Sequence, residues 1–493
     1  MYINDSRHQI YEPTLESVKK HMVPQWYEDA KFGIFLHWGL FSVPAFAPID
    51  KRDIVEIIKE DGWKEQVKNN PYAEWYLNSL RIKNSPVQKY HEEKYGRDYS
   101  YDNFAKTFNE SIKSWDPDVW ADTFKNVGAR YVVLVTKHHD GFLLWPSNYP
   151  NPKKKNWQAS RDIVGELSSS VKSMGMRIGF YYSGGFDWTF NEKAISDIAS
   201  FITNGPVEQE YIDYVHNHFR ELIDKYEPSV LFNDIGFPPE TNLYELFAYY
   251  YNKIPDGVVN DRWMQIPKKR RWIYRLGPIR KTLERKIKKA IAKDGMKPRR
   301  PPHCDYSTPE YTTLSSISEK KWECVRGVGK SFGYNQFETT DHYLTAPELV
   351  RMLVDIVSKN GNLLLNIGPM ADGTLPEIQV KRVTALGEWL KVNGDAIYDS
   401  RPWIRAEGKT DCNIDVRFTK KGDRLCAILM DTPKKRNITI KNLQIRREAI
   451  IVFLGTSRVL TWQQNGEDLF ISLPDKLPEQ PAHVLMISQM ESS

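Results

Sequence analysis

Titratable and polar side chains follow several short apolar runs in this sequence. These ends are His37-Trp38-Gly39, His138-His139-Asp140, Tyr181-Tyr182-Ser183, Asn233-Asp234 and Asp261-Arg262. A short, nearly continuous apolar run bounded by polar residues is typical of a strand buried on both faces of a parallel sheet. Because the carboxyl ends of parallel strands meet at one edge, we expect these side chains to form one site.

Three kinds of chemistry fit these residue types. Metal-assisted hydrolysis would use as ligands His37, His138, His139 and Asp140. The chain has no His-Glu-x-x-His motif, and adjacent histidines on an extended strand point to opposite faces, so this alternative has weak support. Glycoside hydrolysis needs two carboxylates, which would be Asp234 and one of Glu74, Glu310 and Glu323. The third alternative is a binding protein that grips a carbohydrate or an anion without catalysis.

The elements that must position these residues alternate between strands and helices along the first four-fifths of the chain. The expected strands are 32–39, 129–136, 177–182, 229–233, 257–260 and 362–367. Amphipathic patterns predict helices over 162–174, with Gly175 as its cap, and over 377–392. Such alternation favours a (β/α) barrel or a doubly wound sheet.

After about residue 400 the hydrophobic pattern changes to a period of two. Alternating runs at 415–418, 424–429, 437–440 and 449–453 are separated by turn residues. This pattern is typical of antiparallel strands. We therefore expect a catalytic domain over residues 1–398 and a C-terminal β-sandwich over residues 399–493.

Several blocks resemble the α-L-fucosidases of glycoside hydrolase family 29. They are Ala30 to Gly39 followed by Ser42 to Ala45, Pro71 to Tyr76, Lys137 to Phe142 with Leu144-Trp145, Tyr181 to Gly185, and Ser331 to Asn335. These matches occur in the family's order between about residues 25 and 400. The resemblance implies an irregular (β/α)8 TIM-like barrel with a C-terminal antiparallel β-sandwich. It also implies a site with no metal and no cofactor, and retaining hydrolysis of terminal α-L-fucose from a fucosylated oligosaccharide or glycoconjugate.

The resemblance also implies a role for each matching residue. Asp234 matches the nucleophile and Glu310 the general acid/base, with Glu74 as the alternative acid/base and Glu323 the least favoured. The other matches are the hydroxyl-binding His37, His138 and His139, the pocket residues Glu74, Trp75, Tyr181 and Arg262, and the C6 wall of Phe35 and Phe332. Phe232 stands where tryptophan is common and changes the pocket shape. A related α-L-galactosidase, which tolerates a hydroxyl on C6, remains an alternative.

A basic segment interrupts the catalytic domain at residues 264–302. Fifteen lysines and arginines lie between Lys268 and Arg300, against two acidic residues, so the net charge of +6 comes from this segment and the rest of the chain is acidic. Nothing therefore indicates a nucleic-acid partner. Isoleucine or leucine recurs every fourth residue at 279, 283, 287 and 291 and predicts one basic amphipathic helix with flexible flanks, which could be a lid, a subunit contact, a contact to an anionic surface or a solvated insertion.

The remaining composition suggests an ordinary cytoplasmic enzyme. The first thirty residues contain no apolar stretch of secretory length, and no window approaches a membrane span, so we expect a cytoplasmic protein with no membrane partner. Four cysteines in 493 residues, without a Cys-x-x-Cys pair, predict neither a disulfide framework nor a zinc site. A homo-oligomer is compatible with the sequence.

Overall fold

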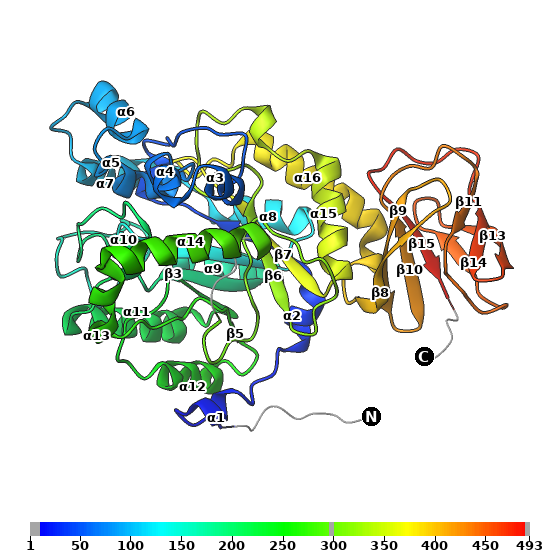
Figure 1. Ribbon diagram of the computed structural model, residues 1–493, viewed down its shortest axis with the longest axis horizontal. Helices are drawn as coiled ribbons and strands as arrows, with labels where there is room; N and C mark the ends of the chain where they lie inside the picture. Colours follow the sequence, from blue (N-terminus) through cyan, green and yellow to red (C-terminus); the bar gives the residue numbers. More distant parts are fainter. Residues whose placement is uncertain (1–9, 295–299, 489–493) are drawn as a thin grey trace.

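The computed structural model describes residues 10–294 and 300–488. Within them, seven parallel strands form one curled sheet in the order β5-β4-β3-β2-β1-β7-β6, which lies inside the larger lobe of the molecule (Figure 1). The strands are β1 (Phe32–Leu36), β2 (Tyr131–Lys137), β3 (Arg177–Ser183), β4 (Val230–Asp234), β5 (Val258–Val259), β6 (Trp322–Gly327) and β7 (Gly361–Ile367). Almost all of their residues are buried, because helices cover the outside and side chains fill the inside.

An extended segment, residues 305–311, lies between the edge strands β5 and β6. On the β5 side, Asp305 N donates to Val259 O at 3.0 Å, and on the β6 side, Glu323 N donates to Ser307 O at 2.8 Å. The segment takes the place of an eighth strand and closes the sheet into a barrel. Neither this segment nor β6 was among the expected strands, because β6 includes a glutamate and an arginine and lacks a continuous apolar run.

Helices surround the barrel (Figure 1). They are α1 (Leu15–Val18), α2 (Gln25–Ala30), α3 (Ile54–Glu60), α4 (Trp63–Lys68), α5 (Tyr76–Leu80), α6 (Pro86–Tyr95), α7 (Phe104–Ser111), α8 (Pro117–Asn126), α9 (Ile163–Ser173), α10 (Ile198–Thr203), α11 (Gln209–Tyr226), α12 (Leu243–Lys253), α15 (Ala346–Ser358) and α16 (Glu377–Asn393). The predicted helices over 162–174 and 377–392 are confirmed as α9 and α16. Asp162 caps α9 by accepting from Gly165 N, and Gly175 ends it with a φ of 70°. Among the helices in the described ranges, none has the length and apolar character needed to cross a membrane.

The basic amphipathic helix predicted within residues 264–302 is confirmed, and it covers the second part of this segment. The segment comprises α13 (Lys268–Arg271), the 3-10 turn η6 (Trp272–Arg275) and α14 (Gly277–Asp294). The flank before α14 is helical too, and a ψ of 126° at Leu276 separates the two pieces. Pro278 then begins the second piece, since a proline has no N–H with which to continue a preceding helix. Figure 1 shows α14 lying across the front of the barrel lobe. The expected flexible flank at residues 295–299 lies outside the described residues.

The C-terminal part of the chain forms an antiparallel sheet that folds over into two layers. Its strands are β8 (Arg401–Lys409), β9 (Asp415–Lys421), β10 (Arg424–Leu429), β11 (Asn437–Ile440), β12 (Ile451–Phe453), β13 (Arg458–Asn465), β14 (Asp468–Ser472) and β15 (His483–Ile487). β13 pairs with β12 through its first residues and with β14 through its last, so it joins the two layers. The layers enclose their own apolar core. The predicted irregular barrel with a C-terminal antiparallel sandwich is confirmed.

Candidate active site

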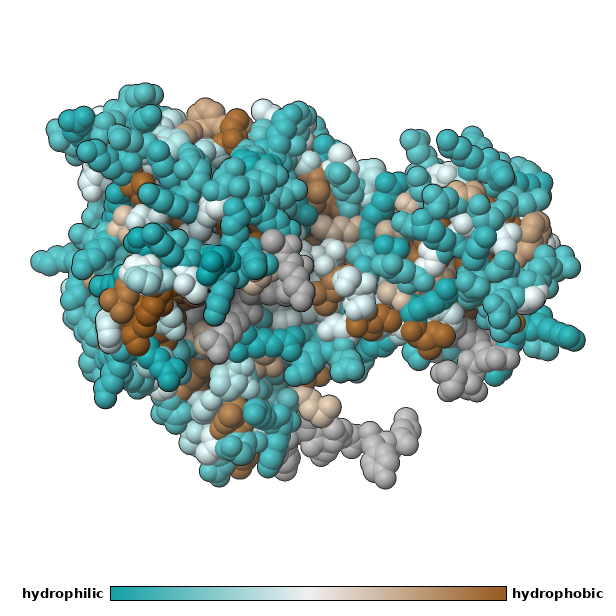
Figure 2. Space-filling view, in the orientation of Figure 1, coloured by the Kyte–Doolittle hydropathy of each residue, from teal (hydrophilic) through white to brown (hydrophobic). Residues whose placement is uncertain are grey.

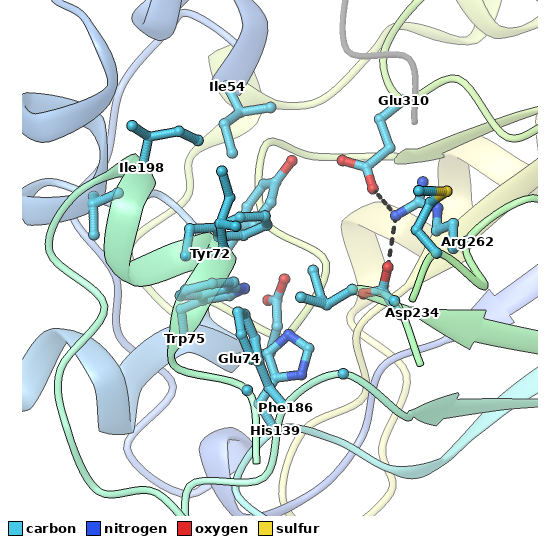
Figure 3. Close-up of a pocket in the computed structure, with 18 of the residues that line it drawn as sticks. Ile54, Tyr72, Glu74, Trp75, His139, Phe186, Ile198, Asp234, Arg262 and Glu310 are labelled. Carbon is cyan, nitrogen blue, oxygen red and sulfur yellow. Dashed lines mark hydrogen bonds and ion pairs between the residues drawn. The ribbon is translucent and has the colours of Figure 1, made fainter. Parts of the chain in front are cut away.

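A cavity of about 710 Å³ lies at the carboxyl ends of the barrel strands. Twelve of the residues considered in the sequence analysis line it: Phe35, His37, Glu74, Trp75, His138, His139, Tyr181, Phe232, Asp234, Arg262, Glu310 and Phe332. Figure 3 shows Asp234, Arg262 and Glu310 on one side of this cavity, with Glu74 and His139 at its base. The parallel register of the barrel brings these strand ends together, as the sequence pattern predicted.

Asp234 is the last residue of β4, and both of its carboxylate oxygens are held. Oδ1 accepts from Arg262 Nη1 at 2.9 Å, and Oδ2 accepts from Tyr181 Oη at 2.8 Å. Burial acts to raise the pKa of Asp234, but the Arg262 guanidinium and the two hydrogen bonds outweigh it and hold the pKa below its usual value. Asp234 is therefore an ionised carboxylate with a fixed orientation.

Glu310 lies in the segment that closes the barrel, opposite Asp234 across the same arginine. Its Oε1 accepts from Arg262 Nη1 at 2.5 Å, so one guanidinium nitrogen bridges the two carboxyl groups (Figure 3). Burial raises the pKa of Glu310 above its usual value; the guanidinium opposes this shift and the Asp234 charge adds to it. The same site thus moves the pKa values of two neighbouring carboxyl groups in opposite directions, the pattern expected when one acts as base or nucleophile and the other as acid.

Each of these two carboxylates is followed by a residue in the left-handed backbone region. The φ of Ile235 is 60° and that of Tyr311 is 47°. Such conformations cost side chains other than glycine about 1–3 kcal/mol each and persist only where the surroundings hold them. Here the turns are held by neighbouring strands, since Gly236 N donates to Arg262 O at 3.1 Å and Tyr311 N donates to Val325 O at 3.2 Å. The chain turns away directly after each carboxylate.

The Arg262 guanidinium is itself fixed by residues that the sequence analysis did not identify. Nε donates to Thr308 Oγ1 at 2.9 Å, and Nη2 donates to Thr308 O at 3.1 Å. Thr308 Oγ1 in turn donates to Asp261 Oδ1 at 2.7 Å. These hydrogen bonds fix the position of the guanidinium relative to both carboxylates. Asp261 stood at a predicted strand end, but nothing in the sequence distinguished Thr308.

Glu74, the alternative acid/base, also lines the cavity but lies in a different environment. Its Oε2 accepts from Gly333 N at 2.7 Å, and burial raises its pKa to about 8. No ion pair of Glu74 occurs among the described residues. A Cβ at position 333 would lie 2.9 Å from the Phe41 ring and 3.1 Å from Glu74 N, so a larger residue there would displace its neighbours. Glu74 is thus a mainly protonated acid at neutral pH.

Glu323, the least favoured candidate, does not line the cavity. It lies near the start of β6, at the opposite end of the barrel interior, and accepts hydrogen bonds from the phenol groups of Tyr27 and Tyr131. Burial raises its pKa to about 7. Its candidacy as the acid/base was wrong, because a side chain near the start of a barrel strand lies in a different layer of the barrel core from the cavity at the carboxyl ends.

Two of the histidines in the cavity are neutral and have defined tautomers. His37 Nδ1 lies 2.6 Å from Asn366 Oδ1, whose amide nitrogen donates elsewhere, so Nδ1 carries the proton. His139 Nδ1 lies 2.6 Å from Ser183 Oγ, whose own proton goes to a backbone carbonyl, so Nδ1 again donates. Burial lowers the pKa of His37 to about 4 and that of His139 to about 3. Each ring therefore keeps Nε2 as a hydrogen-bond acceptor.

His138 and His139 both line the cavity because β2 ends before them, at Lys137. Their ring centroids are 4.0 Å apart, so the opposite orientation expected of an extended pair does not apply. Asp140 accepts a hydrogen bond from Tyr101 Oη at 2.8 Å. Within the described ranges, no three His, Cys, Asp or Glu side chains are grouped so that they could hold a metal ion. The metal-ligand alternative thus finds no support in this geometry.

An aromatic wall faces the histidines. The Phe35 ring centroid lies 4.5 Å from that of His37 and 5.2 Å from that of Phe232, and the Phe332 centroid lies 5.0 Å from that of His37. All of these rings are almost completely buried. One side of the cavity can therefore pack an apolar group next to the hydrogen-bonding histidines.

Comparison with known proteins identifies the family. The family described as "Alpha-L-fucosidase" matches residues 2–395 of this chain. The family described as "Alpha-L-fucosidase C-terminal domain" matches residues 409–488. The chain belongs to the α-L-fucosidase family. The resemblance predicted from the sequence motifs is confirmed, and with it the class of glycoside hydrolases.

Named α-L-fucosidases align with most of the chain. The alpha-L-fucosidase of Dictyostelium discoideum is 32% identical over 82% of this chain and 77% of its own length. The human tissue alpha-L-fucosidase is 30% identical over 95% of this chain and 89% of its own length. A crystal structure of Thermotoga maritima alpha-fucosidase in complex with fucose is 40% identical, covers 97% of this chain and 100% of its own, and superposes with a TM-score of 0.81.

This member of the α-L-fucosidase family contains further cavity residues that the sequence analysis missed. Tyr72, Phe186 and Met264 line the cavity, and so do residues of α3, α4, α10 and α14. Asn366 and Ser183 do not need to touch a ligand to matter, because they set the two histidine tautomers. Ser183 was already named at a strand end, and Asn366 is the second-last residue of the predicted strand 362–367, so the same rule could have found it. No sequence signal pointed to α3, α4 and α10, whereas the apolar stripe of α14 was visible in the sequence and a lid was among its alternatives.

Proposed function

We propose that this chain is a retaining exo-α-L-fucosidase, which hydrolyses terminal α-L-fucosyl linkages by double displacement. Asp234 is the nucleophile and Glu310 is the general acid/base. Family membership supports the fucosidase activity. The observation that carries the residue assignment is the shared contact of Asp234 and Glu310 with Arg262 Nη1, together with the opposite shifts of their pKa values.

The distances in this arrangement favour retention. Oδ1 of Asp234 and Oε1 of Glu310 lie 2.9 and 2.5 Å from the same nitrogen, so these oxygens cannot be further apart than the two distances added together. That limit falls within the separation of about 5 to 5.5 Å typical of retaining glycosidases and below the roughly 6.5 Å at which inverting pairs begin.

The chemistry proceeds in two balanced steps. First, an Asp234 carboxylate oxygen attacks C1 of the fucosyl group, the bond from C1 to the leaving oxygen breaks, and the Glu310 proton moves to that oxygen. Then the Glu310 carboxylate takes a proton from water, the water oxygen attacks C1, and the bond from C1 to Asp234 breaks. Both residues regain their starting protonation states, and fucose leaves with its original α configuration.

The remaining cavity residues bind the sugar. His37 and His139 present acceptor Nε2 atoms to hydroxyl donors, while His138 and the protonated Glu74 add further polar contacts at the base of the cavity. Trp75 lies beside His139, with ring centroids 5.3 Å apart, and supplies an apolar surface for the ring carbons. Phe35, Phe232 and Phe332 form the wall for the C6 methyl group.

The decisive experiment follows the first product formed from 4-nitrophenyl α-L-fucoside. Proton NMR should detect α-L-fucose before mutarotation produces the β anomer. Initial β-L-fucose would contradict the retaining mechanism, and fucose binding without any turnover would favour a non-catalytic binding protein. The same assay in EDTA should keep its rate, since no step uses a metal.

The aromatic wall makes the preference for fucose testable against the α-L-galactosidase alternative. An additional C6 hydroxyl would have to lie against three buried phenyl rings that offer no hydrogen-bond partner. Discrimination of this kind is worth about 1–3 kcal/mol, or roughly tenfold to two hundredfold in kcat/KM. Equal kcat/KM values for the 4-nitrophenyl α-L-fucoside and α-L-galactoside would instead support an enzyme that accepts a hydroxyl on C6.

A further inference from the structure

Helix α14 of the basic insertion forms part of the wall of the active-site cavity. Leu283, Ile287 and Ile291 line the same cavity as Asp234 and Glu310. They are three members of the four-residue stripe in the sequence, and their spacing puts them on one face of the helix. The basic insertion therefore bears directly on what the site can bind.

The position of α14 is set by contacts to two neighbouring helices. Arg280 Nη1 lies 3.3 Å from Asp197 Oδ2 at the start of α10, and Lys288 Nζ donates to Glu60 O at the end of α3 at 3.4 Å. The preceding turn is tied to α10 as well, since Arg275 Nε donates to Thr203 Oγ1 at 3.2 Å. Leu283, Ile287 and Ile291 are thus held between α3 and α10, whereas Ile279 at the start of the stripe is exposed.

Four helices, α3, α4, α10 and α14, enclose a mainly apolar outer part of the cavity. Its apolar lining consists of Ile54, Trp63, Val67, Ile198, Phe201, Ile202, Leu283, Ile287, Ala290 and Ile291, and the polar Gln66 of α4 lines the same cavity. Figure 3 shows Ile54 and Ile198 across the cavity from Asp234 and Arg262. None of the carboxylates that line the cavity belongs to these helices: they are Glu74, Asp234, Asp261 and Glu310.

The basic residues of the insertion contribute little to this wall. Of those that the structure describes, Arg271 alone lines the cavity, and its Nη1 donates to Gly205 O at 2.5 Å. Tyr72 Oη, between the two parts, is buried and has no hydrogen-bond partner among the described residues. A leaving group in the outer part would meet an apolar surface with few polar partners near the cleaved bond.

We infer that this outer part is a binding site for a hydrophobic leaving group, so that the preferred substrates are α-L-fucosides of aliphatic or aromatic alcohols. The inference rests on the proposed function, because the cavity is continuous with the fucose site. A hydroxyl-rich saccharide would lose hydrogen bonds to water against this wall, whereas an apolar group gains from burial. The cavity is also within the size range of sites that bind ligands well beyond one monosaccharide.

Three alkyl fucosides test this without any mutation. Methyl, hexyl and 2-(2-methoxyethoxy)ethyl α-L-fucoside release alcohols of similar acidity, so differences in kcat/KM report binding of the chain. Each fully buried methylene raises kcat/KM by about fourfold. We expect the hexyl compound to exceed the methyl compound by about tenfold or more, and the glycol ether, of similar length to hexyl, to gain far less.

A matched pair of variants on α14 locates the effect. Ile287→Asn should lower the hexyl-to-methyl ratio of kcat/KM by about tenfold, because it puts an amide into the apolar wall. Ile279→Asn is the control: it makes the same change on the same helix, at a residue that is 37% exposed and does not line the cavity, and it should leave the ratio unchanged. If Ile287→Asn does not fold, Leu283→Ala makes a smaller change in the same wall.

The outcomes separate the two proposals. If methyl and hexyl fucosides are hydrolysed equally well, or the glycol ether matches the hexyl compound, the hydrophobic site is overturned and the fucosidase function stands. A ratio that falls equally in Ile279→Asn would also overturn it. Absence of turnover with 4-nitrophenyl α-L-fucoside would instead remove the proposed function and this inference with it.

Discussion

Tyr181 Oη donates a hydrogen bond to Asp234 Oδ2 at 2.8 Å, from the strand next to the one that Asp234 ends. The parallel register pairs Asp234 with Ser183 and Tyr181 with Phe232, so the long phenol side chain reaches forward to the end of β4. The next residue along β3, Tyr182, points the other way and bonds to His218 at 2.9 Å. Alternation along one strand thus separates a tyrosine of the site from one of the outer core.

Tyr181→Phe should weaken the ionised form of Asp234. Loss of the hydrogen bond leaves burial less opposed, so the pKa of Asp234 rises and the acid limb of the kcat/KM profile moves to higher pH. We expect roughly a tenfold loss of kcat/KM at neutral pH, the scale of one hydrogen bond to a charged group. Tyr182→Phe is the matched control, and a shift of its acid limb by the same amount would contradict a local effect.

Asp234→Gly should lower the rate of hydrolysis of an aryl α-L-fucoside at least about a thousandfold, because the group that forms the covalent intermediate is missing. Added azide should restore part of the rate, since a small anion fits the vacated space and attacks C1. The measurement is release of nitrophenol with and without azide. Asp256→Gly, at a half-exposed carboxylate in an ion pair with Arg177, should keep its activity. Full activity in Asp234→Gly would contradict the assignment of Asp234 as the nucleophile.

Glu310→Ala and Glu74→Ala should differ in how the rate depends on the leaving group. Without its acid, the enzyme should still cleave a 2,4-dinitrophenyl fucoside with little loss but lose about 10²–10⁴-fold on an alkyl fucoside. We expect this pattern for Glu310→Ala, and a loss of similar size on both substrates for Glu74→Ala. If the two patterns are exchanged, Glu74 is the acid/base and Glu310 holds Arg262.

Glu74→Gln should make the protein more stable at alkaline pH. The folded pKa of Glu74 is about 8 and its ordinary value is 4.5, so its effect on stability is absent below pH 4.5 and folding is increasingly penalised as pH rises toward 8. A neutral glutamine can keep the hydrogen bond from Gly333 N without that penalty. The Tm difference between mutant and wild type should therefore be larger at pH 8.5 than at pH 5.5. A difference that does not change with pH would contradict this.

Much of the site could be predicted because strand ends are a local property. An apolar run followed by His37, by His138-His139 or by Asp234 indicates that a strand ends there and which reactive side chains follow it. Parallel pairing then brings those strand ends together at one edge of the sheet. The stripe on α14 was likewise visible as a spacing. What covers that stripe was not, because the contacts to α3 and α10 join segments far apart in the chain.

The sequence by itself determined the fold class, the family and twelve of the residues that line the cavity, since these depend on periodicity, motif order and side-chain chemistry. Only the tertiary structure could bring Glu310 onto Arg262, put Glu323 at the far end of the barrel and assign the tautomers of His37 and His139. The physical reason is that a pKa or a tautomer depends on burial and on hydrogen-bond partners. Those partners, Thr308, Asn366 and Ser183, are supplied by other parts of the chain once it has folded.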